Sequence, residues 1–116
     1  MNSNQVMIRK LRNAINKKGG KITYSTTEIF LENQPYPSTM YIIKQAEKND
    51  KTGKNKYEEL FHTFSQIQIV LFLRDYWYIL NNIPLPTDNP KWNAVRKTIP
   101  IFEQYIEEHT KEKVGE

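Results

Sequence analysis

The first apolar pattern on the chain has helical spacing. Between Asn4 and Lys18, Met7, Ile8, Leu11, Ala14 and Ile15 recur every three or four positions, and polar or basic residues fill the positions between them. Gly19 and Gly20 follow, and glycine supplies the left-handed residue that commonly ends a helix. The pattern predicts an N-terminal amphipathic helix with a basic outer face.

The pattern then changes to a period of two. In Lys21–Thr27 (KITYSTT), Ile22, Tyr24 and Thr26 alternate with Thr23, Ser25 and Thr27, which is typical of a half-buried strand. The continuation Glu28–Leu31 has two interpretations. It extends the strand, or Ser25 and Glu28 form a capping box that begins a short helix through Asn33.

Two further strand-like segments, Thr39–Asn49 and Lys54–Phe64, are separated by Asp50-Lys51-Thr52-Gly53. Asp opens a turn well and Gly accepts positive φ, so the segment at about 39–64 predicts a β-hairpin with a type I turn and a bulge. A register with Ile43 opposite Phe61 would place Tyr41, Ile43, Phe61 and Tyr57 on one face of the sheet.

The C-terminal half is helical by pattern. Residues 66–81 are apolar nearly all round, so we expect this helix, with Ser65 as its N-cap, to be the centre of the core. After an extended connector, Pro90 begins a second helix that runs to about Thr98. Pro100 begins or kinks a last helix, which presents Ile101, Phe102, Tyr105 and Ile106 to the core and should fray from about Thr110.

Together these elements predict an α+β fold in one domain, residues 1–116. It contains the amphipathic helix, a small antiparallel sheet and a C-terminal helical layer. The alternative is a winged helix-turn-helix with C-terminal helices, in which Thr26–Asn33 and Ser38–Lys48 are helices and Asp50–Gly53 is the wing. Two prolines strain its tight turn, and Tyr41-Ile42-Ile43 prefers a strand, so the hairpin is favoured.

Composition narrows the class of protein. The chain is 38% hydrophobic and 12% aromatic, enough for a folded core, and it has no cysteine, which excludes disulfides and thiolate metal sites. The start MNSNQVMIRKLRN lacks the apolar run of a secretory signal. The most apolar stretch, 67–80, is interrupted by Gln68, Arg74 and Asp75 and is too short for a bilayer span. We therefore expect a cytoplasmic protein with no membrane partner.

Charge is distributed unevenly along the chain. The net charge is +4, yet residues 1–27 hold six basic side chains and no acidic one, and residues 101–116 hold five Glu against two Lys. The six are Arg9, Lys10, Arg12, Lys17, Lys18 and Lys21. A cluster of this kind binds nucleic acid by releasing counterions from phosphates, so these residues are the candidate nucleic-acid-binding set.

No recognisable catalytic, metal or cofactor site emerges from the sequence. His62 and His109 lie far apart in sequence and neither has a carboxylate at ligand spacing, and no GxSxG or cysteine nucleophile is present. Lys17-Lys18-Gly19-Gly20-Lys21 superficially resembles a phosphate loop, but its glycines end a helix rather than open one, so helix capping is the better interpretation.

A polar seam of Gln68, Asp75 and Asn82 lies along the apolar helix 66–81. Arg74 and Asp75 are adjacent, and neighbours on a helix do not face each other, so we expect them not to pair. The seam is expected to reach solvent or backbone groups at the sheet edge, with a buried contact to a partner or ligand as the alternative.

The function predicted from these features is that of a small non-enzymatic binding or regulatory protein that associates with DNA or RNA through its basic N-terminal helix. The alternative is a protein–protein adaptor or inhibitor that uses exposed tyrosines or the polar seam, or that self-associates basic end to acidic end. An enzyme ranks third, and no cofactor is expected.

Overall fold

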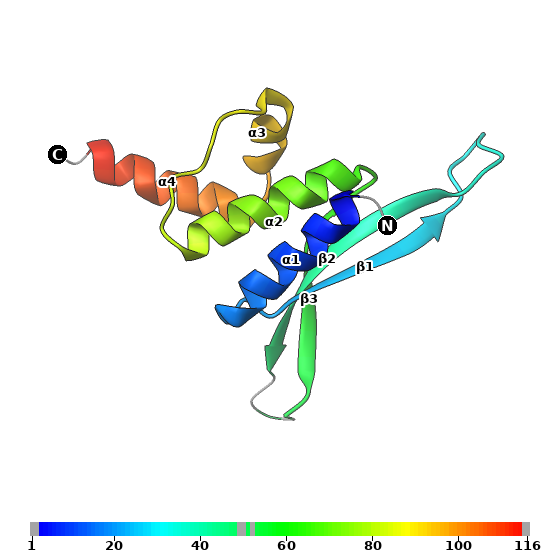
Figure 1. The fold of residues 1–116 in the computed structure, drawn as a ribbon, viewed down its shortest axis with the longest axis horizontal. Coiled ribbons are helices and arrows are strands. Elements are labelled where there is room, and N and C mark those ends of the chain that lie inside the picture. The colour runs from blue at the N-terminus through cyan, green and yellow to red at the C-terminus, as the bar shows by residue number, and fades with distance from the viewer. Residues whose placement is uncertain (1–2, 49–50, 52, 115–116) are drawn as a thin grey trace.

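A computed structural model describes residues 3–48, 51 and 53–114; the side chains of Lys48, Asn55 and residues 110–114 lie outside this description. The chain order is helix, three strands and three helices (Figure 1). The bounds are α1 Ser3–Lys17, β1 Ile22–Ile29, β2 Ser38–Lys48, β3 Asn55–Thr63, α2 Gln66–Leu80, α3 Pro90–Arg96 and α4 Pro100–Val114. The predicted α+β class is confirmed.

Helix α1 ends where the glycines predict. Gly19 has a φ of 84°, and the Gly20 N–H returns to the Ile15 carbonyl at 3.0 Å. Gly20 has a different role, because a Cβ at this position would collide with the Ile15 side chain. The Asn16 side chain then accepts from the Ile22 N–H at 2.7 Å and donates to the Ile22 carbonyl at 3.0 Å, which fixes the direction in which β1 leaves α1.

The strands form an antiparallel sheet in the order β1-β2-β3. Strand β1 extends to Ile29, so the strand interpretation of Glu28 and Ile29 is confirmed and the helical one is wrong. Strand β2 is the central strand and pairs on both sides, with Tyr41 opposite Thr26 and Thr63. The winged-helix alternative is therefore wrong, because the β-branched and aromatic residues of β2 satisfy their backbone groups in two ladders rather than in a helix.

The predicted pairing of Ile43 with Phe61 is confirmed, but Tyr57 does not share their face. The register shifts between Ile43 and Lys44, so β3 carries one extra residue, and every later pair changes side. Gln45 faces the helices and donates to the Tyr76 hydroxyl at 3.1 Å, whereas Ala46, the partner of Tyr57, lies on the other face. Tyr57 is accordingly 52% exposed.

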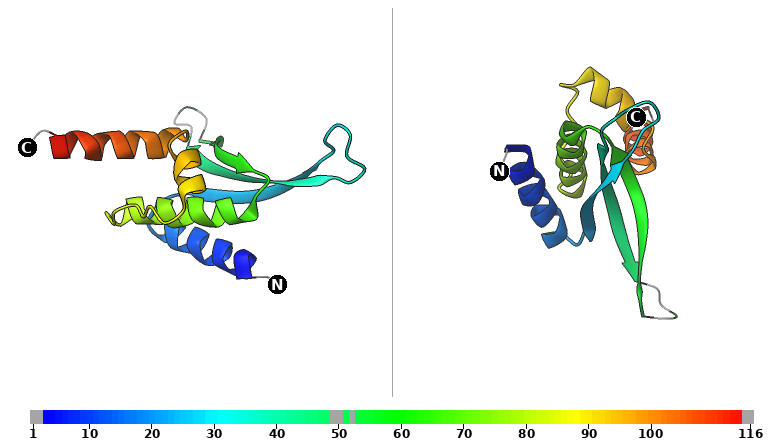
Figure 2. Two further views of the ribbon diagram at one scale, coloured as in Figure 1. Left: turned by 90° about the horizontal axis from the view of Figure 1, so that it is seen from above. Right: turned by 90° about the vertical axis from the view of Figure 1, so that its right-hand side faces the viewer.

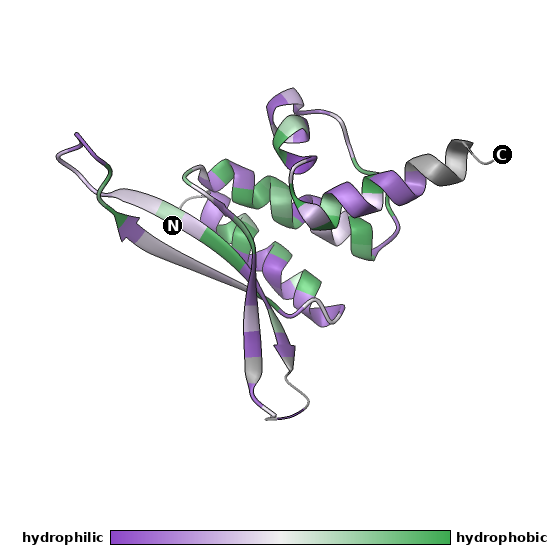
Figure 3. Cartoon of the chain, turned by 180° about the vertical axis from the view of Figure 1, so that it is seen from behind, coloured by the Kyte–Doolittle hydropathy of each residue, from purple (hydrophilic) through white to green (hydrophobic). Residues whose placement is uncertain are grey.

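The core lies where α2 meets the sheet, with α1 beside it. Both α1 and α2 lie on one side of the sheet (Figure 2), and α2 is the most uniformly hydrophobic helix (Figure 3). Phe72 of α2 is fully buried and stacks on Phe61 of β3 with centroids 5.4 Å apart. Trp92 and Phe102, from α3 and α4, meet these rings edge-on. The prediction that α2 is the centre of the core is confirmed.

The predicted starts and ends of the C-terminal helices agree only in part with the structure. Asn89 caps α3, since its side chain accepts from the Trp92 N–H at 3.0 Å and Pro90 follows it. Ser65 occupies the N-cap position of α2, but its side chain makes no capping bond. Helix α3 ends at Arg96, two residues before the predicted end. Helix α4 reaches Val114, beyond Thr110, and fraying of that end stays a prediction.

Two segments project from opposite ends of the molecule, the β1–β2 turn at one end and the C-terminal part of α4 at the other (Figures 1 and 2). Within the residues described, every helix falls short of the length and apolarity that crossing a membrane demands.

The β2–β3 turn tests the predicted hairpin chemistry. Most of Asp50–Gly53 lies outside the described residues, so the turn type stays a prediction, but Gly53 has the expected positive φ, 70°. Apart from its chain neighbours, no described residue has an atom within 4 Å of a Cβ built on Gly53, so backbone strain decides the effect of a substitution. We expect Gly53→Val to lower the free energy of unfolding by about 1–2 kcal/mol in urea denaturation. Gly53→Asn is the control and should cost less, because Asn tolerates positive φ; equal losses would contradict the assignment.

Candidate functional site

The structure places the six predicted basic residues on α1 and the turn after it. Arg9, Lys10, Lys17, Lys18 and Lys21 are exposed, and Arg12 is half-buried. None of the six forms an ion pair in the part of the chain that is described. Because no carboxylate of the described residues pairs with them, their charge is available to an external anion.

A polar hollow of about 470 Å³ separates α1 from β1, and Arg9 and Arg12 line it together with Gln5, Tyr24 and Thr26. Lys10 and Lys17 lie about 100° and about 80° round the helix axis from Arg9 and do not line the hollow. Lys18 and Lys21 lie beyond the end of the helix. The fold therefore brings two of the six basic residues together and spreads the other four over neighbouring surface.

Strand β1 supplies the other wall of the hollow, which sequence reasoning did not assign to the site. Tyr24 stacks on Tyr41 of β2, with ring centroids 6.4 Å apart. Burial raises the pKa of the Tyr24 phenol above its usual value, and the Gln66 side chain opposes this only in part. The phenol thus stays a neutral group at physiological pH. The sequence did contain a signal for this wall. Ile22, Tyr24 and Thr26 alternate with polar residues along β1, and this alternation puts Tyr24 and Thr26 on the face of the strand toward α1.

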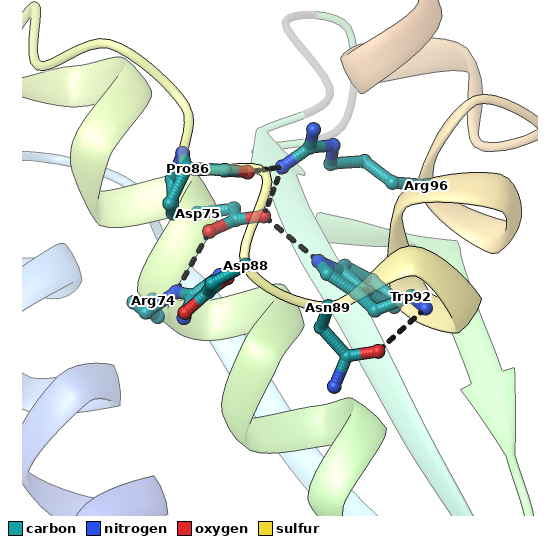
Figure 4. Close-up of polar contacts among 7 residues, drawn as sticks. All are labelled: Arg74, Asp75, Pro86, Asp88, Asn89, Trp92 and Arg96. Atoms are coloured by element: carbon teal, nitrogen blue, oxygen red, sulfur yellow. Dashed lines mark hydrogen bonds and ion pairs between the residues drawn. The ribbon is translucent and has the colours of Figure 1, made fainter.

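A second polar cluster is buried between α2, α3 and the connector that joins them, residues 81–89 (Figure 4). Asp75 is completely buried. One carboxylate oxygen accepts from Trp92 Nε1 and from Arg96 Nη1, each at 2.8 Å, and the other accepts from Arg74 Nε at 2.9 Å. Arg96 Nη1 also donates to the Pro86 carbonyl at 2.9 Å. The carboxylate thereby joins α2 to α3 and to the connector before α3.

Arg74 continues this network to the surface, where both of its Nη atoms donate to Asp88, at 3.1 and 3.3 Å. Burial alone would lower the pKa of Arg74, but the hydrogen bonds and charges of Asp75 and Asp88 outweigh it and raise that pKa above its usual value. Two guanidinium groups and two carboxylates balance in charge. The cluster is therefore a structural clamp.

These contacts correct the interpretation of the polar seam. The prediction that Arg74 and Asp75 do not pair is wrong, because the long Arg74 side chain turns so that its Nε reaches the neighbouring carboxylate. Asp75 reaches neither solvent nor backbone at the sheet edge; other side chains satisfy it. Gln68 accepts from the Thr63 hydroxyl at 2.7 Å, and Asn82 lies past the end of α2 with a φ of 56°.

The two histidines occupy separate places. His62 of β3 pairs with Glu59 at 2.9 Å, and His109 Nδ1 donates to the Tyr105 carbonyl at 2.9 Å. Among the residues that the structure describes, no three His, Asp or Glu side chains gather in a way that could hold a metal ion.

Comparison of the chain with protein-family models, with curated proteins and with solved structures finds no significant match.

The clamp around Asp75 should contribute to the stability of the fold. Arg96→Met should lower the free energy of unfolding by about 3–5 kcal/mol, because it leaves a buried carboxylate with too few partners. The double variant Asp75→Leu with Arg96→Met should lose less than Arg96→Met alone, since it removes both buried charges. Urea denaturation followed by circular dichroism measures both values.

Asp88→Asn is the control for this pair of variants. Asp88 is 60% exposed in its side chain, so its loss should cost less than about 1 kcal/mol. A double variant that is less stable than Arg96→Met would show that the clamp depends on charge pairing less than on shape.

Proposed function

We propose that this is a non-enzymatic protein that binds the phosphate backbone of DNA or RNA through α1 and the hollow beside it. The observation that carries the proposal is the position of Arg9 and Arg12, which flank one polar hollow and have no ion-pair partner in the described part of the chain. A guanidinium group presents two parallel N–H donors, which match two oxygens of a phosphate.

The chemistry of the hollow suits a phosphate diester. Two arginines supply charge, and the Thr26 hydroxyl and Tyr24 phenol that line the same hollow are neutral donors. The four surrounding lysines, Lys10, Lys17, Lys18 and Lys21, add a wider positive field that attracts the polyanion. Contacts of this kind position a protein on nucleic acid without reading its sequence. The proposal also places the protein in the cytoplasm. RNA is present there, and a chain without cysteine suits a reducing compartment, in which disulfides rarely form.

The test compares two double variants that each remove two positive charges. Arg9→Gln with Arg12→Gln should weaken binding to a labelled duplex DNA and a labelled single-stranded RNA, and should flatten the slope of log affinity against log salt by about 1.8 on the duplex. Lys10→Gln with Lys17→Gln should weaken binding less, because these lysines do not line the hollow. Fluorescence anisotropy at about 50 to about 200 mM salt measures both effects.

Two outcomes would contradict the proposal. Wild-type protein that shows no salt-sensitive binding at about 50 mM salt would remove nucleic acid as the partner. Equal weakening in the two double variants would show that the total charge of α1 matters and the hollow does not.

A second candidate function, recognition of a protein partner, is favoured by the β1–β2 turn. Phe30 and Tyr36 are 73% and 76% exposed at the projecting end of the sheet, and Leu31 lies beside them. Within this turn the Gln34 N–H donates to the Leu31 carbonyl at 3.2 Å. An ordered turn that holds aromatic side chains in solvent loses little entropy on binding. Residues 22–43 contain two glutamates and no basic residue, which favours a partner with a basic rim over an anionic membrane.

Capture from cell extract tests this second function. Phe30→Ser with Tyr36→Ser should keep the stability of the wild type within about 0.5 kcal/mol, because both side chains are exposed. Proteins captured by the immobilised wild type and identified by mass spectrometry should be lost with this variant and retained with Tyr57→Ser, the control on the open sheet face. If both variants still capture these proteins, the turn is not the binding surface.

A further inference from the structure

A groove of about 470 Å³ lies between the connector that follows α2 and the exposed side of α4. Its apolar lining includes Leu85 of the connector together with Tyr105 and Ile106 of α4. The volume is in the range of small-molecule sites, which are mostly apolar with a few polar groups that fix orientation. This groove is separate from the hollow beside α1 and shares no lining residue with it.

Three side chains with basic nitrogens, Arg96, Lys97 and His109, line the groove, and no Asp or Glu among the described residues does. Arg96 is 4% exposed. Its Nη1 is already engaged by Asp75 and by the Pro86 carbonyl, each within 2.9 Å, but its Nε is buried and has no hydrogen-bond partner in the described part of the chain. A buried donor of a charged group without an acceptor is costly, so this end of the groove favours a ligand that brings an acceptor.

The other two basic side chains lie nearer to solvent. Lys97 is exposed at the end of α3, and no ion pair of its side chain is found among the residues described. His109 donates its Nδ1–H to the Tyr105 carbonyl, and its ring lies over the Tyr105 ring with centroids 3.9 Å apart. This bond fixes the ring, so its Nε2 is the remaining polar atom of the imidazole.

We propose that the groove binds a small amphipathic carboxylic acid, with its hydrocarbon body on Leu85, Tyr105 and Ile106 and its carboxylate at the Arg96–Lys97 end. The carboxylate supplies acceptors to the Arg96 Nε–H and to Lys97, and charge favours an anion because Asp75 and Asp88 balance Arg74 and Arg96, whereas Lys97 has no ion-pair partner among the residues described. An ammonium amphiphile of the same length meets the same apolar wall but is repelled at the charged end.

Titration of isotope-labelled protein by two-dimensional NMR tests the proposal with octanoate as the probe. Amides of Leu85, Thr87, residues 96–97 and residues 105–109 should shift and saturate with octanoate. Octylammonium and octanol, which share its hydrocarbon chain, should bind at least tenfold more weakly, because each lacks the anionic acceptor. Failure of octanoate to saturate these amides, or equal affinity for the three probes, overturns the proposal.

Two surface substitutions locate the carboxylate. Lys97→Gln should weaken octanoate binding about five- to tenfold, the loss of one charge-assisted hydrogen bond. Lys91→Gln, an exposed lysine on α3 outside the groove, is the matched control and should leave the affinity unchanged. Equal affinities in these two variants would overturn the assigned position of the carboxylate.

Ile106→Glu tests the apolar wall by placing a second carboxylate in the groove, and it should abolish octanoate binding while circular dichroism reports an unchanged fold. Octanoate binding in this variant would overturn the proposal. The variant Arg9→Gln with Arg12→Gln should bind octanoate as the wild type does, so the groove and the α1 surface are tested independently.

Discussion

The burial of Asp75 is the constraint on which the C-terminal half of the structure depends. A carboxylate with no exposure needs partners on all of its acceptor sites, and it finds them in Trp92, Arg96 and Arg74. Trp92 and Arg96 belong to α3, and Arg74 is the residue before Asp75 on α2. The Asp75 carboxylate is therefore satisfied only when α3 is packed against α2 in this one arrangement. Apolar packing of Trp92 alone would leave α3 free to slide along α2.

The position of α3 in turn sets the surroundings of the connector and α4. Arg96 holds the Pro86 carbonyl, and Phe102 at the start of α4 packs on Phe72 and Trp92 in the core. The rest of α4 projects from the core (Figure 1). The groove lies between this part of α4 and the connector. Arg96 therefore serves the clamp through Nη1 and also lines the groove, and its buried Nε has no hydrogen-bond partner among the described residues. The same requirement for charge balance links the stability of the fold to the chemistry of the groove.

The opposite side of the molecule is organised by shape and by turn geometry. The two hydrogen bonds of Asn16 to Ile22 and the glycine end of α1 fix the direction in which β1 leaves α1, and the hollow lined by Arg9 and Arg12 lies between these two elements. The bulge after Ile43 turns Tyr57 out of the core and leaves it on the open face of the sheet. The surfaces on this side are therefore shaped by backbone geometry, whereas the groove beside α4 is shaped by the way in which the buried charge of Asp75 holds α3.

The sequence by itself predicted the four helices and the pairing of Ile43 with Phe61, because side-chain period, capping residues and turn residues act within a few positions of one another. For residues 26–48 it favoured strands but left a helix-turn-helix open, and the two ladders of β2 decided between them. It also identified the basic residues of α1. Only the tertiary structure decided which of them share a hollow, that Tyr57 lies outside the core, and that Asp75 is met by Trp92 and Arg96 from distant positions. The reason is that a bulge and a buried ion pair depend on contacts between segments far apart in the chain, which no local pattern records.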